Sequence, residues 1–161
     1  LVICMITTKF FLPGAEAINK GIAGEQFFAG FGKTKDDFAP DLITVAYGTN
    51  DWAGGIHKEV FEERSDKFFG ALASNYPNAK IFAIAPIWRA DWQNLHAIGE
   101  FFNVRAQFAK IAEKYPSVTL IDGFDFLPHD PELYNDKFLH PHDGGFAYYA
   151  EGLTKALEQY I

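Results

Sequence analysis

The chain has 161 residues, of which 48% are hydrophobic and 22% charged, a composition typical of one soluble globular domain with its own core. Its net charge of −7, with no cluster of Lys or Arg, argues against a nucleic acid or an anionic membrane surface as partner. No apolar run reaches the ~20 residues that a membrane span needs. Cys4 is the only cysteine, which excludes an intrachain disulfide and a cysteine-based zinc site.

The first apolar stretch is "VICMITTKFF" (2–11). Only six residues separate Thr8 from Ala15, whereas two parallel strands need a connection of a dozen or more residues. We therefore predict the end of a helix here, with Val2, Ile3, Ile6 and Phe10 on its buried side, and no central parallel strand within the first eight residues.

The remaining chain alternates apolar runs with amphipathic segments. Runs such as "DLITVAYG" are rich in β-branched residues, as in strands that are buried on both faces of a parallel sheet. Segments with apolar residues at helical spacing lie between these runs. The alternation predicts an α/β protein with a parallel sheet in a single domain, 1–161. The expected strands are 15–21, 41–48, 79–86 and 118–123, and the expected helices are 57–75, about 94–115 and 144–161.

A loop with polar or glycine residues follows each expected strand. These loops are "GIAGE", "GTND", "PIWRADW" and "DGFDF". Because ligands of parallel sheets bind at the carboxyl ends of the strands, we expect all four loops at one edge.

Two of these loops contain candidate donors for an oxyanion. Asn50 in "YGTNDW" (47–52) would present a neutral amide at the sheet edge, and Gly24 in "NKGIAGE" (19–25) could direct a backbone N–H to the same place. A plain strand-to-helix turn is the alternative for both. Asp51 is expected to cap the following helix.

The stretch "DKFLHPHDGG" (136–145) contains the best candidate for a catalytic base. His140 precedes Pro141 at the start of the last helix, and a histidine base needs a carboxylate such as Asp136 to orient its ring. Asp143 is expected to be the N-cap of that helix, with His142 as a bystander or at the pocket rim. A metal site on the two histidines lacks a third ligand at a fixed spacing.

These three stretches, in this order, resemble the SGNH (GDSL-like) hydrolase family of serine esterases and acylhydrolases, from about Leu12 to the C-terminus. The resemblance implies a flavodoxin-like three-layer α/β/α sandwich with a parallel sheet. It also implies a Ser-His-Asp mechanism without metal or other cofactor. By the same resemblance, Gly24 and Asn50 form the oxyanion hole and His140 is the catalytic histidine.

The sequence departs from the family pattern at two places. The family acid stands three residues before the histidine, where this chain has Lys137; either the loop curves so that Asp136 reaches the ring, or a backbone carbonyl braces a dyad. No Gly-Asp-Ser block is present, so we expect the nucleophile and the first strand to lie upstream of Leu1 in the natural protein, or another chain to supply that segment. None of the three serines fits the block: Ser65, Ser74 and Ser117.

The expected activity is hydrolysis of a small-molecule or carbohydrate ester, such as a carbohydrate acetyl ester, a lipid ester or a short-chain ester. Trp52, Trp88 and Trp92 could form an aromatic wall for the substrate, or they could plug the sheet edge. Arg89 could receive an anionic group, or it could pair with Asp91.

Two other functions are considered. A non-catalytic carbohydrate- or ligand-binding protein would have kept the pocket and lost the nucleophile. A flavodoxin-like ligand or metal binder would use Asp41, Asp51 and Asp122, but Asp41 precedes its strand and so lies at the wrong end of the sheet.

Overall fold

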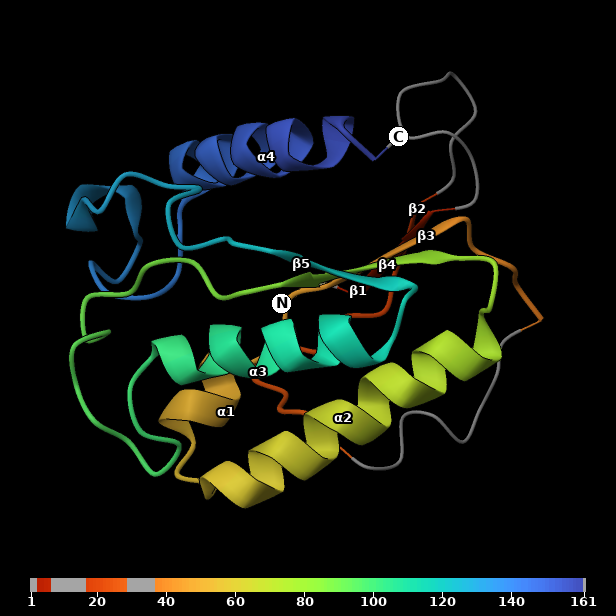
Figure 1. The fold of residues 1–161 in the computed structure, drawn as a ribbon. Helices are drawn as coiled ribbons and strands as arrows, with labels where there is room; N and C mark the ends of the chain where they lie inside the picture. The colour runs from red at the N-terminus through yellow and green to blue at the C-terminus, as the bar shows by residue number, and fades with distance from the viewer. Residues whose placement is uncertain (1–2, 7–16, 29–36, 161) are drawn as a thin grey trace.

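The fold is a three-layer α/β/α sandwich. The computed structural model describes residues 3–6, 17–28 and 37–160. Figure 1 shows helix α4 on one face of a central sheet and helices α1, α2 and α3 on the other face.

Within the described residues, the sheet has five strands in the order β2-β1-β3-β4-β5, which is the flavodoxin-like order. Strands β3, β4 and β5 are mutually parallel, and their apolar sequences place β3 and β4 at the centre of the fold. The four predicted strands are confirmed. The strands are β1 (Ile3–Ile6), β2 (Ala17–Asn19), β3 (Leu42–Val45), β4 (Lys80–Ile84) and β5 (Val118–Ile121).

Strand β1 corrects the prediction for the start of the chain. Residues Ile3–Ile6 form a strand and not the end of a helix, and they lie between β2 and β3, antiparallel to both. The position between β2 and β3 is therefore filled by this chain's own residues. The physical reason is that the backbone groups of β3 need a partner on that side, and a short run with β-branched isoleucines can pair there as well as it can form a helix.

The strand directions confirm the shared edge of the loops. Because β2 is antiparallel to β1, and β1 is antiparallel to β3, β2 runs in the same direction as β3. The four loops predicted from the sequence thus follow strands that end at one edge of the sheet.

Two of the three predicted helices match the structure closely, 57–75 and 144–161. The third starts about eight residues late, because Gly99 has a φ of +99° and residues His96 and Gly99 pair with each other in a β-bridge. A short helix, α1, also follows β3. The helices are α1 (Thr49–Ala53), α2 (Lys58–Asn75), α3 (Phe102–Lys114) and α4 (Asp143–Glu158), and Pro131–Leu133 form a 3-10 turn.

Aromatic side chains build the larger core, between the sheet and helices α2 and α3. The ring of Phe27, fully buried, lies 5.1 Å from the rings of Tyr47 and Phe68. A smaller core lies beneath α4 on the other face. It contains Leu42, Phe82, Ile84, Ile121 and Leu157.

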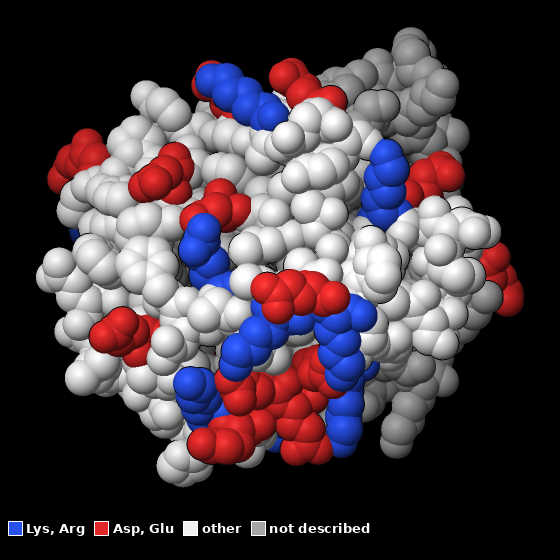
Figure 2. Space-filling view, viewed as in Figure 1, with Lys and Arg blue, Asp and Glu red and all other residues white. Residues whose placement is uncertain are grey.

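The outer surface of α2 and α3 is charged. Figure 2 shows acidic and basic side chains gathered over these two helices, where Lys110 pairs with Glu62 and Lys114 with Asp66 across the helix pair. Within the described residues, no helix has the length and apolar character to cross a membrane.

Candidate active site

The structure joins the loops of Gly24 and Asn50. The Asn50 side-chain amide donates a hydrogen bond to the carbonyl of Glu25 (3.1 Å), and the Gln26 side chain donates to the carbonyl of Asn50 (3.0 Å). Gly24 is adjacent to Glu25 and has a φ of +78°, which a glycine adopts without the steric cost of a side chain. The two candidate donors therefore belong to one hydrogen-bonded assembly, and an amide group retains a second N–H after the bond to Glu25.

Asp51 corrects a prediction: its side chain does not cap α1. Gly48 is the N-cap of α1, and Asp51 lies inside this helix, completely buried. One carboxylate oxygen accepts from the backbone N–H of Phe27 (2.9 Å), whereas the other has no partner among the described residues. Burial raises the pKa of Asp51 to about 6, although backbone N–H groups, that of Phe27 first, act in the opposite direction.

Asp136 and His140 form a contact pair in the loop before α4. His140 Nδ1 lies 2.6 Å from Asp136 Oδ2, and because a carboxylate only accepts, Nδ1 carries the hydrogen. The other oxygen, Oδ1, accepts from the three successive backbone N–H groups of Phe138, Leu139 and His140 at 2.8–3.0 Å. A carboxylate one residue further back than the family spacing thus reaches the ring.

Lys137 makes this reach possible. It is the one non-glycine residue with positive φ (59°) in the described part of the chain, and the left-handed conformation folds the turn tightly around the Asp136 carboxylate. The backbone N–H of Lys137 donates to the carbonyl of Tyr134 (3.0 Å), and its ammonium group pairs with Glu132. The residue that displaces the family acid therefore shapes the turn that brings Asp136 to His140.

The environment keeps Asp136 ionised. Burial alone would raise its pKa, but the N–H groups of Leu139 and His140, the His140 ring and the N–H of Phe138 together hold the pKa well below its usual range. An ionised carboxylate at Nδ1 leaves the Nε2 atom of His140 as the proton acceptor, which is the arrangement a general base needs.

His142, and not Asp143, is the N-cap of α4. Its Nδ1 accepts from the backbone N–H groups of Gly144 (2.9 Å) and Gly145 (3.4 Å), and its Nε2 lies 2.9 Å from the carbonyl of Glu132. Asp143 is the first helical residue. The prediction was one residue late because histidine is an uncommon cap, whereas Asp is a preferred one.

The three tryptophans do not form an open aromatic wall. Trp52 is fully buried, and its indole N–H donates to the carbonyl of Gly99 (3.0 Å). Trp88 is 8% exposed and stacks on His129. Trp92 is half-buried against Phe124. The burial of Trp52 and Trp88 favours the alternative that these two tryptophans plug the sheet edge.

Arg89 pairs with Asp91, which is one of the two partners expected from the sequence. Its Nε and Nη2 atoms donate to the two oxygens of Asp91 at 2.5 and 3.1 Å, and Nη1 donates to Oγ1 of Thr49 (3.0 Å). The residue is only 3% exposed. Its donors are thus directed at the protein's own groups rather than outward to an anionic substrate.

Comparison with known proteins identifies the family. The model described as the GDSL-like Lipase/Acylhydrolase family matches residues 8–148. The chain belongs to the GDSL-like lipase/acylhydrolase family. A multidomain esterase from Ruminococcus flavefaciens is 27% identical over 129 residues, a match that covers 77% of this chain and 16% of that protein.

Solved structures share the fold at low identity. A carbohydrate esterase family 3 protein from Talaromyces cellulolyticus has a TM-score of 0.59 at 17% identity, covering 85% of this chain and 68% of the other. A salicylyl-acyltransferase from a tetracycline biosynthetic pathway has a TM-score of 0.65 at 20% identity, covering 83% and 42%. The present chain thus spans less than half the length of the salicylyl-acyltransferase and about one sixth of the length of the multidomain esterase.

The serines of this GDSL-like chain lie away from the candidate site. Ser65 is buried in α2, where its hydroxyl donates to the carbonyl of Phe61 (2.7 Å), and Ser74 lies in the same helix. Ser117 directly precedes β5, at the opposite edge of the sheet. Among the described residues, no group of three or more His, Cys, Asp or Glu side chains could hold a metal ion.

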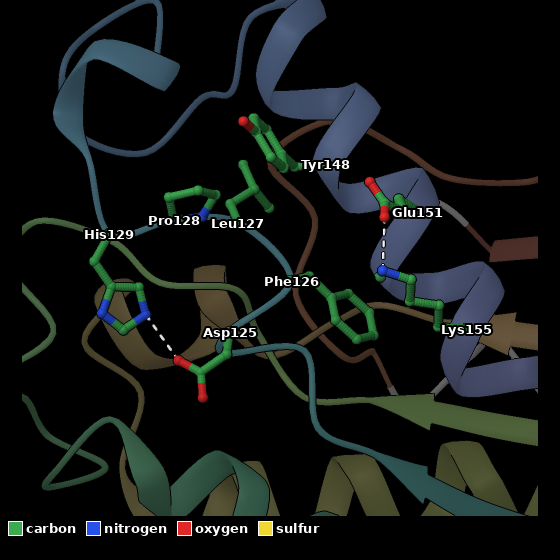
Figure 3. Close-up of a pocket in the computed structure, with 9 residues that line it drawn as sticks. Asp125, Phe126, Leu127, Pro128, His129, Tyr148, Glu151 and Lys155 are labelled. Atoms are coloured by element: carbon green, nitrogen blue, oxygen red, sulfur yellow. Dashed lines mark hydrogen bonds and ion pairs between the residues drawn. The ribbon is translucent and has the colours of Figure 1, made fainter.

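A second acid–histidine pair lies in a surface groove that the sequence analysis missed. Figure 3 shows Asp125 and His129 facing each other on the loop after β5, with Glu151 and Lys155 paired on α4. The groove has a volume of about 690 Å³, and none of the predicted site residues lines it. An Asp with a His four residues later, the same spacing as in Asp136 and His140, is the signal that could have found this pair. The structure therefore offers an internal control for the candidate base.

Proposed function

We propose that this chain carries the base, the acid and the oxyanion hole of a Ser-His-Asp carboxylic ester hydrolase. His140 is the general base, Asp136 the acid, and Asn50 with the Gly24 backbone N–H the oxyanion donors. The observation that carries the proposal is the Asp136–His140 contact of 2.6 Å, with three backbone N–H groups on the same carboxylate. Membership of the GDSL-like family supports the reaction class.

The proposed mechanism has two steps. A serine hydroxyl attacks the acyl carbon while Nε2 of His140 takes its proton, and the carbonyl oxygen becomes an oxyanion that accepts from Asn50 and Gly24. The intermediate collapses, the alcohol leaves with the proton from Nε2, and an acyl-serine remains. Water then attacks the acyl-serine in the same way, with His140 again as base, and the free acid and the serine are released.

The nucleophile in this proposal is a serine outside these 161 residues. Support comes from the positions of the three serines, in α2 and before β5, which the fold holds away from the loops of Asn50 and His140. The test therefore uses the full-length natural protein.

We propose a carbohydrate acetyl ester as the substrate class. The support is the likeness to a multidomain esterase and to a protein named as a carbohydrate esterase. Trp92 is the tryptophan of the three with the least buried side chain, and its ring is suited to the apolar face of a sugar.

The catalytic roles are tested with p-nitrophenyl acetate. His140→Ala should lower kcat by about 10⁴-fold or more, and Asp136→Asn by about 10³–10⁴-fold, because triad residues act as a unit. His129→Ala is the matched control, because it removes a histidine with the same spacing to an aspartate, and its kcat should equal that of the wild type. Unchanged turnover in His140→Ala would refute the assignment.

The substrate class is tested separately. Release of acetate from an acetylated oligosaccharide should exceed hydrolysis of a long-chain p-nitrophenyl ester in kcat/KM. The opposite preference would contradict the carbohydrate ester while leaving the catalytic residues in place.

A further inference from the structure

We propose that Arg89 is a positioning residue that holds the Asp136–His140 turn against the helix of Asn50. The inference rests on the proposed function, because it assumes that His140 and Asn50 act on the same substrate. It differs from the expectation that Arg89 binds an anionic substrate group.

The first observation is the connection to α1. Arg89 Nη1 donates to both the carbonyl (3.3 Å) and the hydroxyl (3.0 Å) of Thr49, which is the residue before Asn50. Asp91 fixes the other side of the guanidinium through two hydrogen bonds. A fork held by four hydrogen bonds to two residues has one orientation, and its burial prevents exchange with water.

The second observation is the connection to the turn. The guanidinium carbon of Arg89 lies 5.5 Å from the ring centroid of Phe138 and 5.0 Å from that of Trp52, both within the range of cation–π attraction. The next residue, Ala90, donates its backbone N–H to the carbonyl of Phe138 (3.0 Å). Phe138 stands between Asp136 and His140, and its own N–H binds the Asp136 carboxylate.

Arg89 therefore contacts the neighbours of both candidate groups. On one side it holds Thr49, next to Asn50, and on the other it holds Phe138, inside the turn. The turn itself is exposed, with His140 and Asp136 side chains 73% and 39% accessible. An exposed turn needs an anchor on the body of the protein to keep its base at a fixed distance from the oxyanion donors, and a misplacement of ~1 Å can cost ~100-fold in rate.

The test compares Arg89→Met with Arg105→Met in the full-length natural protein. Arg105, on α3, pairs with Asp122 (2.6 Å) and is half exposed, so it is a control arginine that also has an aspartate partner, outside the turn. Two quantities are measured: kcat and KM for p-nitrophenyl acetate, and the NMR resonance of the His140 Nδ1 proton, which reports the hydrogen bond to Asp136 without turnover.

For Arg89→Met we expect kcat to fall by about 10–100-fold with KM changed less than about twofold, and the Nδ1 proton resonance to shift or broaden. The kcat and the Nδ1 resonance of Arg89→Lys should lie between those of the wild type and Arg89→Met, because an ammonium group cannot bridge Thr49 and Asp91 as a guanidinium does. Arg105→Met should match the wild type in both quantities.

Phe138→Ala keeps the proposal testable if the Arg89 variants do not fold. Its ring is 38% exposed, so the core is untouched, and we expect a several-fold lower kcat with a changed Nδ1 resonance.

Three outcomes separate the possibilities. A raised KM with unchanged kcat and resonance would overturn positioning in favour of substrate binding. Lower stability with unchanged kcat and resonance would overturn it in favour of a purely structural role. If the wild-type protein hydrolyses no ester but the Nδ1 resonance still changes in Arg89→Met, the anchoring of the turn is supported and the proposed function is refuted.

Discussion

Asp51 offers a quantitative test of the structure through the pH dependence of stability. Its pKa is raised from 3.8 to about 6, first by burial. At ~1.4 kcal/mol per pKa unit, this increase corresponds to about 3 kcal/mol between the protonated and ionised forms of the folded protein.

The sign follows from proton binding. Between about pH 4 and pH 6 the folded protein holds the Asp51 proton and the unfolded chain has released it. The folded state therefore binds more protons in this window, and the free energy of unfolding falls as the pH rises. The free-energy cost of ionising the buried Asp51 side chain is absent below about pH 4 and complete above about pH 6.

Asp51→Asn removes this ionisation. The amide oxygen can still accept from Phe27, and the new buried N–H₂ group adds an offset that does not depend on pH. We expect the stability of the variant relative to the wild type to increase by about 3 kcal/mol between pH 4 and pH 7. Urea unfolding at four pH values measures this difference.

Glu63→Gln is the control with the opposite sign. Lys67 lowers the pKa of Glu63 through an exposed hydrogen bond, so its contribution is present above the ordinary carboxylate pKa and is lost as the pH falls. The relative stability of Glu63→Gln should therefore change little and in the other direction. A difference between Asp51→Asn and wild type that stays constant from pH 4 to pH 7 would refute the assignment of a buried, protonatable Asp51.

Variants at three further positions test local features by urea unfolding. His142→Ala should lose about 1 kcal/mol because α4 loses its N-cap, whereas His142→Asn should lose less; equal losses would contradict the cap. Lys137→Gly should keep or raise stability because a left-handed residue costs about 1–2 kcal/mol unless it is glycine, whereas Lys137→Pro cannot adopt this φ and loses the bond to Tyr134; a proline variant with wild-type ester hydrolysis would count against the turn. Gly48→Ala should be destabilised by more than about 2 kcal/mol, because its Cβ would lie 2.4 Å from Val104 at a φ of +107°; a wild-type midpoint would show that the position relaxes.

The sequence alone determined the strands of the sheet that follow Ala15, the helices 57–75 and 144–161, and the common edge of the loops. These features depend on local information. A buried parallel strand needs a continuous apolar run, an amphipathic helix needs a 3.6-residue period, and the direction of parallel strands brings their following loops together. Candidate residues such as Asn50 and His140 were found because their loops follow such strands.

Only the tertiary structure decided which side chains meet. It paired Ile3–Ile6 antiparallel to β3, since a four-residue apolar run has no preference strong enough to choose between helix and strand. It buried Trp52 and enclosed Arg89, since burial depends on residues distant in the sequence. Asp136 reaches His140 because Lys137 adopts a left-handed conformation, and the spacing of residues in the sequence does not reveal this conformation. Contacts between distant segments set these outcomes, and local sequence carries no signal for them.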